Sequence, residues 1–432
     1  MGGMLETLRN AWRIPDLRKK ILFTVAMLLV YRIGSHIPNP IVDAKVFSDL
    51  LNAGGSLGGF LDIISGGSFR LATIFAFSIT PYINSSIIMQ LLTVAIPALE
   101  RLQKEGEEGR KIIQQYVRYG AVLLGLVQAI ALYIPVQSRN GILDGGSVLS
   151  FLMFTLTFTA GTAFLMWLGE QITEYGVGNG ISMIIFAGIL SRGPNGAEGL
   201  IANYKLGNFG EGVIGILVIA VILAIFIVVI AGVIWVQEAE RRIPIQYAKR
   251  VVGRKMYGGQ STHLPIKVNL AGVIPIIFAM SIMMFPSTII GMFFSNTDNW
   301  FVNLFKNPER NALYIVIYSL LILFFTFFYS IIQFNPIEIA NNMKKNGGFI
   351  PGYRPGKATS DYITKVLNRI TWFGGFFLAI ITIAPIIVGN VTGIPGIWLG
   401  GTTVLILVGV AMDTVKQIES QMLMRHYKGF LE

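Results

Sequence analysis

The sequence predicts an all-α polytopic membrane protein with ten transmembrane helices, and three observations support this fold class. The 432 residues are 53% hydrophobic and only 13% charged, which suits one membrane domain better than several soluble ones. Stretches of 17 or more residues without Lys, Arg, Asp or Glu recur along the chain. A helix needs about 20 apolar residues to cross a bilayer. The connections between the stretches alternate between rich and poor in basic residues.

The uncharged stretches define the expected helices in chain order. A first, weaker one opens at Ile21 and is interrupted by Arg32. The clear stretches that follow are Leu71–Leu99, Tyr119–Ser138, Gly145–Gly169, Tyr175–Ser191, Gly212–Gln237, Val268–Thr297, Asn311–Ile337 and Ile370–Met412. The last holds 43 residues and is split by the Gly- and Pro-containing segment 389–395, so two spans are expected there and ten in total.

The charge distribution orients these helices. With ten spans both termini lie on one side, together with every second connection. That side would carry 26 of the 34 Lys and Arg residues, and the opposite connections would carry 7. The positive-inside rule therefore places both termini in the cytoplasm. The net charge of +11 also predicts a basic cytoplasmic surface that could attract anionic lipid, RNA or an acidic protein.

Catalytic and metal-binding chemistry finds little support in the sequence. There is no cysteine, and His36, His263 and His426 are far apart, so neither a thiol site nor a metal cluster is expected. The segment Gly352–Ala358 resembles a phosphate-binding loop but lacks its first glycine and its final Ser or Thr. We therefore expect no enzyme, no cofactor and no nucleotide hydrolysis by this chain.

Charged residues are scarce within the expected spans. Arg32, Glu170 and Asp413 lie near span ends, where snorkelling towards water explains them. An ion-coupled transporter needs such residues at depth, so a proton- or cation-coupled pump is disfavoured. Basic residues precede the first apolar segment as in a signal peptide, but no small-residue cleavage pattern follows it at 34–40. This segment is expected to be a retained span.

The connection between the first two spans contains a short apolar segment. Phe60–Ile64 is flanked by glycines and is too short to cross a membrane. Two interpretations remain open. The segment is either an extracytoplasmic loop with one amphipathic turn, or a short re-entrant helix that is buried in protein or lines a cavity.

Two spans contain a proline at corresponding positions. Pro81 lies in span two and Pro275 in span seven, which are the second members of each half if the ten spans divide into five and five. A proline inside a span removes a helix hydrogen bond and kinks the helix. Paired interruptions are typical of the central pathway of a repeat-built membrane protein. The alternative is that proline is simply common in membrane helices.

Polar side chains gather in spans two, three, seven and eight. They are Thr80, Asn84, Ser85, Gln90, Gln128, Ser281, Ser287, Thr288, Gln333 and Asn335. Ordinary interhelical hydrogen bonds explain most such residues. The alternative is a seam between helices that opens.

Two cytoplasmic connections, at about 238–267 and 335–370, are long, basic and rich in turn signals. The first combines β-prone residues with a glycine pair, which predicts a hairpin that projects from the membrane. A solvated basic loop is the simpler account of both connections. Their mixed Tyr, Arg and Pro content favours docking of a cytosolic partner.

Several long motifs identify a family when they are taken together. They are RIGSHIPNP (32–40), SITPYIN (78–84), GVGNGIS (176–182), RRIPIQYAKR (241–250), STHLPIKVN (261–269), GVIP (272–275), FNPIEIANNMKKNGGFIPGYRPG (334–356) and GGTTVLI (400–406). The chain resembles the SecY family, the channel subunits of the bacterial protein-translocation complex, along essentially its whole length.

The resemblance implies two pseudo-symmetric five-helix halves around a central pore. Residues 1–205 would form the N-terminal half, with spans one to five and a plug segment at about 57–67. Residues 206–432 would form the C-terminal half, with the two long cytoplasmic loops.

The resemblance also implies roles for particular residues. An apolar ring would narrow the pore at Ile79, Ile83, Ile181, Ile185, Ile277 and Ile406. The plug would contain Phe60, Leu61, Asp62, Ile63 and Ile64. A lateral gate, between spans two and three and spans seven and eight, would contain Thr80, Asn84, Gln90, Gln128 and Ser281. The docking sites for the SecA ATPase and the ribosome would contain Arg242, Lys249, Arg250, Arg254 and Arg354. β-Branched apolar side chains suit a constriction that closes by dewetting and yields around a passing chain.

The function predicted from these features is a passive protein-conducting channel in the bacterial cytoplasmic membrane. Unfolded secretory polypeptides would cross it, and hydrophobic segments would leave it sideways into lipid. SecA or the ribosome would supply the energy, and the basic loops could contact ribosomal RNA through its phosphates. The other partners implied are SecE, SecG, signal sequences and membrane lipids.

Three alternatives remain. A secondary transporter of a small solute fits ten spans but not the missing intramembrane carboxylates. An intramembrane enzyme fits poorly because no catalytic pair lies at depth. A SecY paralogue devoted to a few substrates is hard to separate by sequence.

Overall fold

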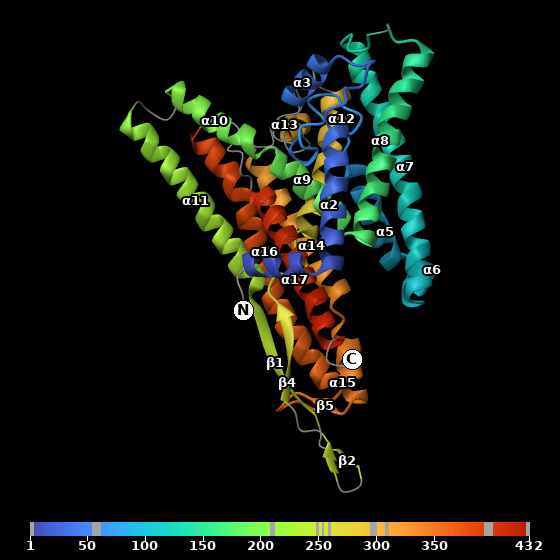
Figure 1. Ribbon diagram of the computed structural model, residues 1–432, viewed down its shortest axis with the longest axis vertical. Helices are drawn as coiled ribbons and strands as arrows, with labels where there is room; N and C mark the ends of the chain where they lie inside the picture. Colours follow the sequence, from blue (N-terminus) through green and yellow to red (C-terminus); the bar gives the residue numbers. More distant parts are fainter. Residues whose placement is uncertain are drawn as a thin grey trace. The chain divides into compact units, whose positions relative to one another are not determined.

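The structure is a computed structural model that describes residues 4–53, 62–143, 145–207, 212–247, 250–252, 255–257, 261–293, 300–306, 311–392 and 401–428. The described part is mostly helical (Figure 1). It divides into two compact units. The first contains Met1–Ile219, Met283–Arg310 and Val410–Glu432, and the second contains Ala220–Ile282 and Asn311–Gly409.

The first unit is built from helices, and three of them share an aromatic core. Its helices are α1 (Met4–Arg13), α2 (Pro15–Gly34), α3 (Ala44–Ala53), α5 (Thr80–Ala95), α6 (Pro97–Lys104), α7 (Glu107–Ser138), α8 (Val148–Tyr175), α9 (Gly180–Ser191), α10 (Gly193–Lys205) and α13 (Trp300–Lys306). Phe47 from α3, Tyr133 from α7, and Phe154 and Phe158 from α8 are buried together in its core. Burial of such large side chains is the main favourable term in packing these helices.

The second unit combines helices with a small sheet. Its elements are β1 (Glu240–Tyr247), β2 (Arg250–Val252), β3 (Lys255–Tyr257), β4 (Ser261–Lys267), α14 (Ala312–Gln333), α15 (Pro336–Lys345), β5 (Gly348–Phe349) and α16 (Lys357–Thr392). Three further helices pass from one unit into the other along the chain, namely α11 (Val213–Glu238), α12 (Ile274–Phe293) and α17 (Gly401–Lys428).

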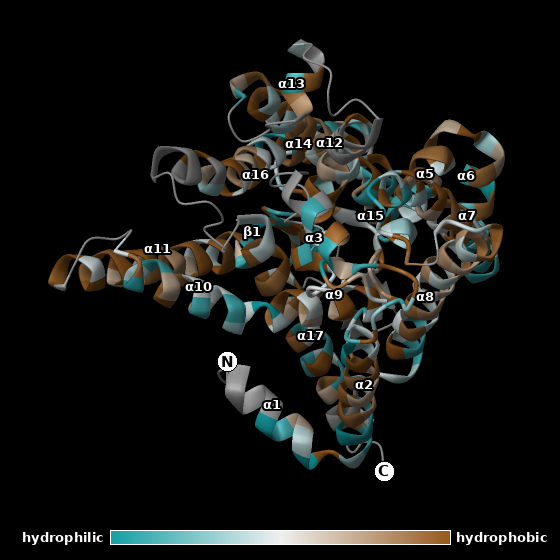
Figure 2. Cartoon of the chain, turned by 90° about the horizontal axis from the view of Figure 1, so that it is seen from above, coloured by the Kyte–Doolittle hydropathy of each residue, from teal (hydrophilic) through white to brown (hydrophobic). Residues whose placement is uncertain are grey.

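Several of these helices are long and apolar enough to cross a membrane. Among the described residues six pass this test, namely α7, α8, α11, α14, α16 and α17, and α5 with α6 passes as a pair bent by 102°. Helix α11 is hydrophobic along nearly its whole length (Figure 2), and almost none of its side chains are buried within the chain. A helix with an unburied apolar surface of this kind is typical of a membrane span.

The hairpin predicted for the first long connection is confirmed. Strands β1 and β4 pair antiparallel from Glu240 opposite Lys267 to Gln246 opposite Ser261, and β2 pairs with β3 between them in the chain (Figure 1). Strand β5, from the second long connection, adds to the other edge of β1 and gives the order β4-β1-β5. The two connections that the sequence presents separately therefore form one sheet.

The predicted kinks at Pro81 and Pro275 are wrong. Each proline is the second residue of its helix, Pro81 in α5 and Pro275 in α12. The first turn of a helix tolerates proline because its amide donors have no partner within the helix. In both cases the residue three positions before the proline has a positive φ. These residues are Ser78, at 51°, and Gly272, at 62°. The two prolines therefore start helices after a break.

Prolines do occur in the interior of helices at Pro135 in α7, Pro286 in α12 and Pro385 in α16. Each removes one backbone hydrogen bond from the interior of its helix.

Candidate functional site

The segment that begins at Asp62 is held by buried polar contacts. Phe60 and Leu61 lie outside the described residues, whereas Asp62, Ile63 and Ile64 begin the next described segment. Asp62 is 3% exposed and forms an ion pair with Arg192, at the end of α9. Its other carboxylate oxygen accepts a hydrogen bond from the Arg70 amide at 3.0 Å. A carboxylate this deeply buried is tolerated only because it is paired in this way.

The end of α2 holds the same segment from a second element. The Tyr31 hydroxyl donates to the Ser65 carbonyl at 3.2 Å, and Arg32 Nη1 donates to the Gly66 carbonyl at 3.2 Å and to Ser191 Oγ at 2.9 Å. Two arginines from different elements therefore hold the described part of the expected plug segment.

These contacts correct the snorkelling interpretation of two charged residues. Arg32 does not simply reach for water, because it binds Gly66 and Ser191. Glu170 forms an ion pair with Arg118 at 2.6 Å, which joins α8 to α7. A charge at the edge of an apolar span indicates that the residue has a partner. The sequence does not identify that partner, because the partners here are 34 or more residues away along the chain.

The six expected ring residues come from both units. In the first unit, Ile79 and Ile83 lie one helical turn apart at the start of α5, and Ile181 and Ile185 lie one turn apart on α9. Ile79 and Ile185 are buried, whereas Ile83 and Ile181 are partly exposed. In the second unit, Ile277 on α12 is partly exposed and Ile406 on α17 is buried.

The GVGNGIS motif explains how Ile181 is positioned. Asn179 caps α9, and its side chain accepts a hydrogen bond from the Ser182 amide at 3.1 Å. Gly178 has a φ of 86°, which favours glycine, and a side chain at Gly180 would overlap the carbonyl of Gly169 in α8. Helix α9 can start this close to α8 only because residue 180 has no side chain.

The expected gate residues differ in their surroundings. Thr80, Asn84 and Gln90 lie on α5, and Gln90 is exposed. The Asn84 side-chain oxygen is buried and has no hydrogen-bond partner in the described part of the chain. Gln128 on α7 and Ser281 on α12 are partly exposed. Ser85, from the same polar group on α5, instead donates to the Val117 carbonyl at 2.8 Å and so joins α5 to α7.

The expected docking residues are only partly described. Lys249 and Arg254 lie outside the described residues, and of Arg250 only its place in β2 is described. Arg242 is exposed on β1 and pairs with Glu240 at 2.6 Å. Arg354 is exposed in the turn before α16, where its carbonyl accepts a hydrogen bond from Thr359 Oγ1 at 2.8 Å.

One apolar core supports both basic connections. Ile243, Ile245 and Ile266 from the hairpin are buried against Met343 of α15 and Ile363 of α16. Asn335 caps α15 by accepting hydrogen bonds from the Ile337 and Glu338 amides at 3.2 and 3.4 Å. The exposed side chains of the two connections are therefore carried by one packed body, which we call the basic module (residues 239–270 and 334–370).

Comparison with known proteins places this architecture in a family. The sequence profile of the SecY family matches residues 73–415. Protein translocase subunit SecY of Halalkalibacterium halodurans is 48% identical, over 99% of this chain and 100% of the relative. The subunit of the same name from Bacillus subtilis is 45% identical, with the same coverage.

Solved structures show the same fold. One described as a protein-conducting channel covers 93% of this chain and 92% of its own, with a TM-score of 0.62 and 20% identity. Sec61 in a canine ribosome–channel complex covers 93% of this chain and 92% of its own, with a TM-score of 0.57 and 18% identity. From the family match and the nearly full-length identity, we conclude that the chain belongs to the SecY family.

Proposed function

We propose that this chain is the protein-conducting channel through which unfolded secretory polypeptides cross the bacterial cytoplasmic membrane, and from which hydrophobic segments leave sideways into lipid. The observation that carries the proposal is the 48% identity to a protein translocase subunit over nearly the whole of both chains. The several membrane-spanning helices support the location.

In this proposal the chain crosses the membrane ten times, in two five-helix halves at 1–205 and 206–432. Two features support the repeat. Helices α5 and α12 both start with a proline as second residue, and both follow a positive-φ residue at the same spacing. Both termini and the basic module would face the cytoplasm, because that side collects the basic residues.

The pore would be closed by the six-isoleucine ring and by the plug around 57–67. The contacts of Asp62, Ser65 and Gly66 support the plug, because they hold its described residues against α2 and the end of α9. The gate would lie between spans two and three and spans seven and eight. The unpaired buried oxygen of Asn84 supports a seam there. Such an oxygen destabilises the closed arrangement of the helices, because opening would let it bind water or another polar group.

The basic module would dock the energy-supplying partners. Arg354 would contact the SecA ATPase, and Arg242, Lys249, Arg250 and Arg254 would contact ribosomal RNA. The structural similarity to Sec61 in a ribosome–channel complex supports the ribosome as a partner. SecE and SecG would complete the complex, and the chain itself would perform no catalysis.

The experiment that tests the function uses the absence of cysteine. Ile83→Cys is made in the complete translocase, and a secretory polypeptide with a single cysteine is arrested midway through transport. We expect a disulfide between the two that depends on SecA and ATP, because the ring would surround the moving chain.

The matched control is Leu123→Cys on α7, an apolar position that is 63% exposed in the chain. We expect no crosslink there, because it would face lipid. Equal crosslinking at both positions, or none at Ile83 while the substrate is protected from protease, would refute the ring assignment.

A further inference from the structure

One face of α9 runs from the expected pore ring to the ion pair of the expected plug segment. Spacings of four, three and four residues place four positions on this face, at Ile181, Ile185, Gly188 and Arg192. The first two belong to the expected ring, and Arg192 pairs with Asp62. Gly188 lies between the ring residues and the ion pair, and its surroundings explain why this position has no side chain.

Gly188 is in direct contact with the backbone of the expected plug segment. A methyl group added to Gly188 would lie 2.6 Å from the Ile64 carbonyl oxygen and 3.0 Å from the Tyr31 hydroxyl. A methyl group added to Gly66, on the plug side, would lie 3.0 Å from Gly188 Cα. Non-bonded carbon atoms pack best at about 3.5–4.0 Å, so neither methyl group has room. The plug backbone can lie on α9 because both residues are glycine.

Arg32 from α2 holds this contact from a second element. Its Nη1 donates to the Gly66 carbonyl at 3.2 Å and to Ser191 Oγ at 2.9 Å. Ser191 Oγ donates in turn to the Gly188 carbonyl at 2.6 Å. The bond to Gly66 is already at the long end of the usual range of about 2.7–3.2 Å, so lifting the plug backbone from α9 would weaken it. The close fit at Gly188 and the Arg32 hydrogen bonds therefore depend on each other.

We propose that Gly188 is the seat of the plug, a positioning residue whose missing side chain lets the plug backbone lie on α9 in the closed channel. The inference rests on the proposed function, because it presumes a channel that the plug closes. A side chain at Gly188 would lift Ile64 and Gly66 and weaken the Arg32 hydrogen bond. The plug would then leave its closed position more often, and the resting channel would leak.

The first test measures the chloride permeability of the complete translocase in vesicles, without SecA or preprotein. Gly188→Ala should raise this resting permeability at least about fivefold, because overpacking a close contact shifts its equilibrium by at least that factor. Gly188→Val adds more atoms at the same place and should raise the permeability further. Unchanged permeability of both variants would overturn the proposal.

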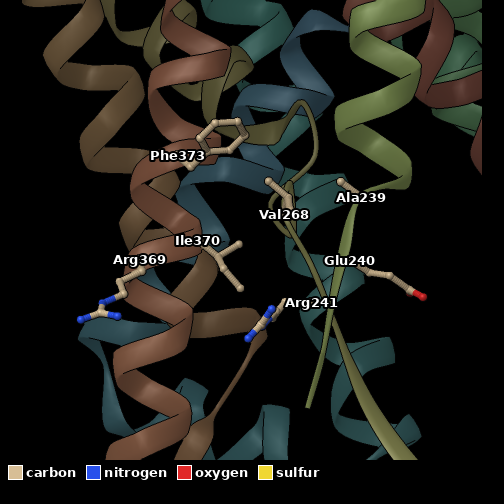
Figure 3. Close-up of a pocket in the computed structure, with 7 residues that line it drawn as sticks. All are labelled: Ala239, Glu240, Arg241, Val268, Arg369, Ile370 and Phe373. Atoms are coloured by element: carbon tan, nitrogen blue, oxygen red, sulfur yellow. The ribbon is translucent and has the colours of Figure 1, made fainter. Parts of the chain in front are cut away.

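Two control variants add side-chain atoms where the structure leaves room. Gly199→Ala is the matched change on α10, where an added methyl group would meet no atom within 4 Å. Phe373→Trp enlarges a side chain that is 56% exposed and lines a groove of the second unit, between the base of the hairpin and α16 (Figure 3). Both should leave the resting permeability unchanged, and unaltered unfolding temperatures would show that all the variants are folded.

Deletion of residues 57–67 separates an effect on the plug from a general effect on α9. The deleted chain should be permeable at rest, and Gly188→Ala should add nothing to it, because no plug remains to be displaced. A further rise in permeability would show that the substitution acts through the packing of α9 on α2. That outcome would also overturn the proposal.

A reporter cysteine follows the plug segment without any deletion. Ser65 is 1% exposed, and the chain has no cysteine of its own, so Ser65→Cys introduces a single buried thiol. A maleimide added to the purified complete translocase should label this thiol at least about fivefold faster when Gly188→Ala is present. Equal labelling rates with and without Gly188→Ala would contradict a seat at this position.

SecA-driven transport by the unaltered translocase tests the proposed function separately. Normal transport together with equal labelling rates would refute the seat and leave the channel function standing. Absent transport would refute the channel function, and the labelling rate would still decide whether Gly188 holds this segment.

Discussion

Arginine at the edge of an apolar span has a specific partner in this protein. Arg192 pairs with the buried carboxylate of Asp62, and Arg32 binds the backbone four residues further on. The side chains of Arg192 and Asp62 are only 15% and 4% exposed. Removing one partner from a buried pair leaves the other charge uncompensated, which costs about 3–5 kcal/mol. The expected plug segment therefore depends strongly on this ion pair.

Arg192→Gln tests this dependence. We expect the closed channel to loosen, because Asp62 loses its counter-charge, so that transport of a preprotein without a functional signal sequence rises at least about tenfold. Transport assays in vesicles measure it. Arg192→Lys should retain most of the wild-type behaviour, and Arg139→Gln, an exposed arginine, should have no effect.

A double-mutant cycle isolates the ion pair from other effects of Arg192. Adding Asp62→Asn to Arg192→Gln should restore part of the closed behaviour, because no unpaired charge remains. If Asp62→Asn and Arg192→Gln simply add, the ion pair does not hold the channel closed.

At the scale of elements, close approach of backbones sets how the helices pack. A side chain added at Gly161 in α8 would overlap the carbonyl oxygen of Ile74. One added at Gly125 in α7 would lie 3.8 Å from Thr162, which is ordinary contact. The same substitution should therefore have opposite effects at two buried helical glycines.

Gly161→Ala should destabilise the first unit by about 1–3 kcal/mol, because α8 must move away from the segment before α5. Gly125→Ala should be neutral or stabilise by up to about 1 kcal/mol, since alanine restricts the unfolded chain and favours helix. Thermal unfolding of the purified complex measures both. A lower midpoint for Gly125→Ala than for Gly161→Ala would contradict this packing.

At the scale of the whole molecule, the proposed function requires the two halves to part. Asn84 and Gln90 lie on α5, and the Asn84 oxygen is buried without a partner in the described chain. An unpaired buried polar group destabilises the closed state by about 1–3 kcal/mol, which lowers the free energy needed to separate the helices around it. Polar residues at the proposed gate would therefore keep the channel easy to open.

The double variant Asn84→Leu/Gln90→Leu should slow preprotein transport at least about fivefold, because the resting state gains the free energy that the unpaired oxygen costs. The initial rate of SecA-driven transport into vesicles measures it. Gln103→Leu, an exposed glutamine on α6, is the control and should transport normally. Normal transport by the double variant would remove Asn84 and Gln90 from the gate.

The sequence by itself determined the class of this protein. The length of the hydrophobic runs predicts membrane helices, because a helix hydrogen-bonds its own backbone polar groups in lipid and needs about 20 apolar residues to cross it. The motifs indicated the family. Turn residues and β-prone residues predicted the β1–β4 hairpin because those signals are local. The ring, plug, gate and docking residues remain predictions that the structure locates only in part.

Only the tertiary structure decided which distant residues meet. Pro81 and Pro275 begin helices because the segments before them break the chain direction, which run length does not reveal. Arg32 and Arg192 bind residues of the expected plug segment, and β5 joins β1 across about 100 residues of chain. Such pairings follow from the burial of charge and of unpaired strand edges, and the partner that satisfies each is fixed by packing in three dimensions.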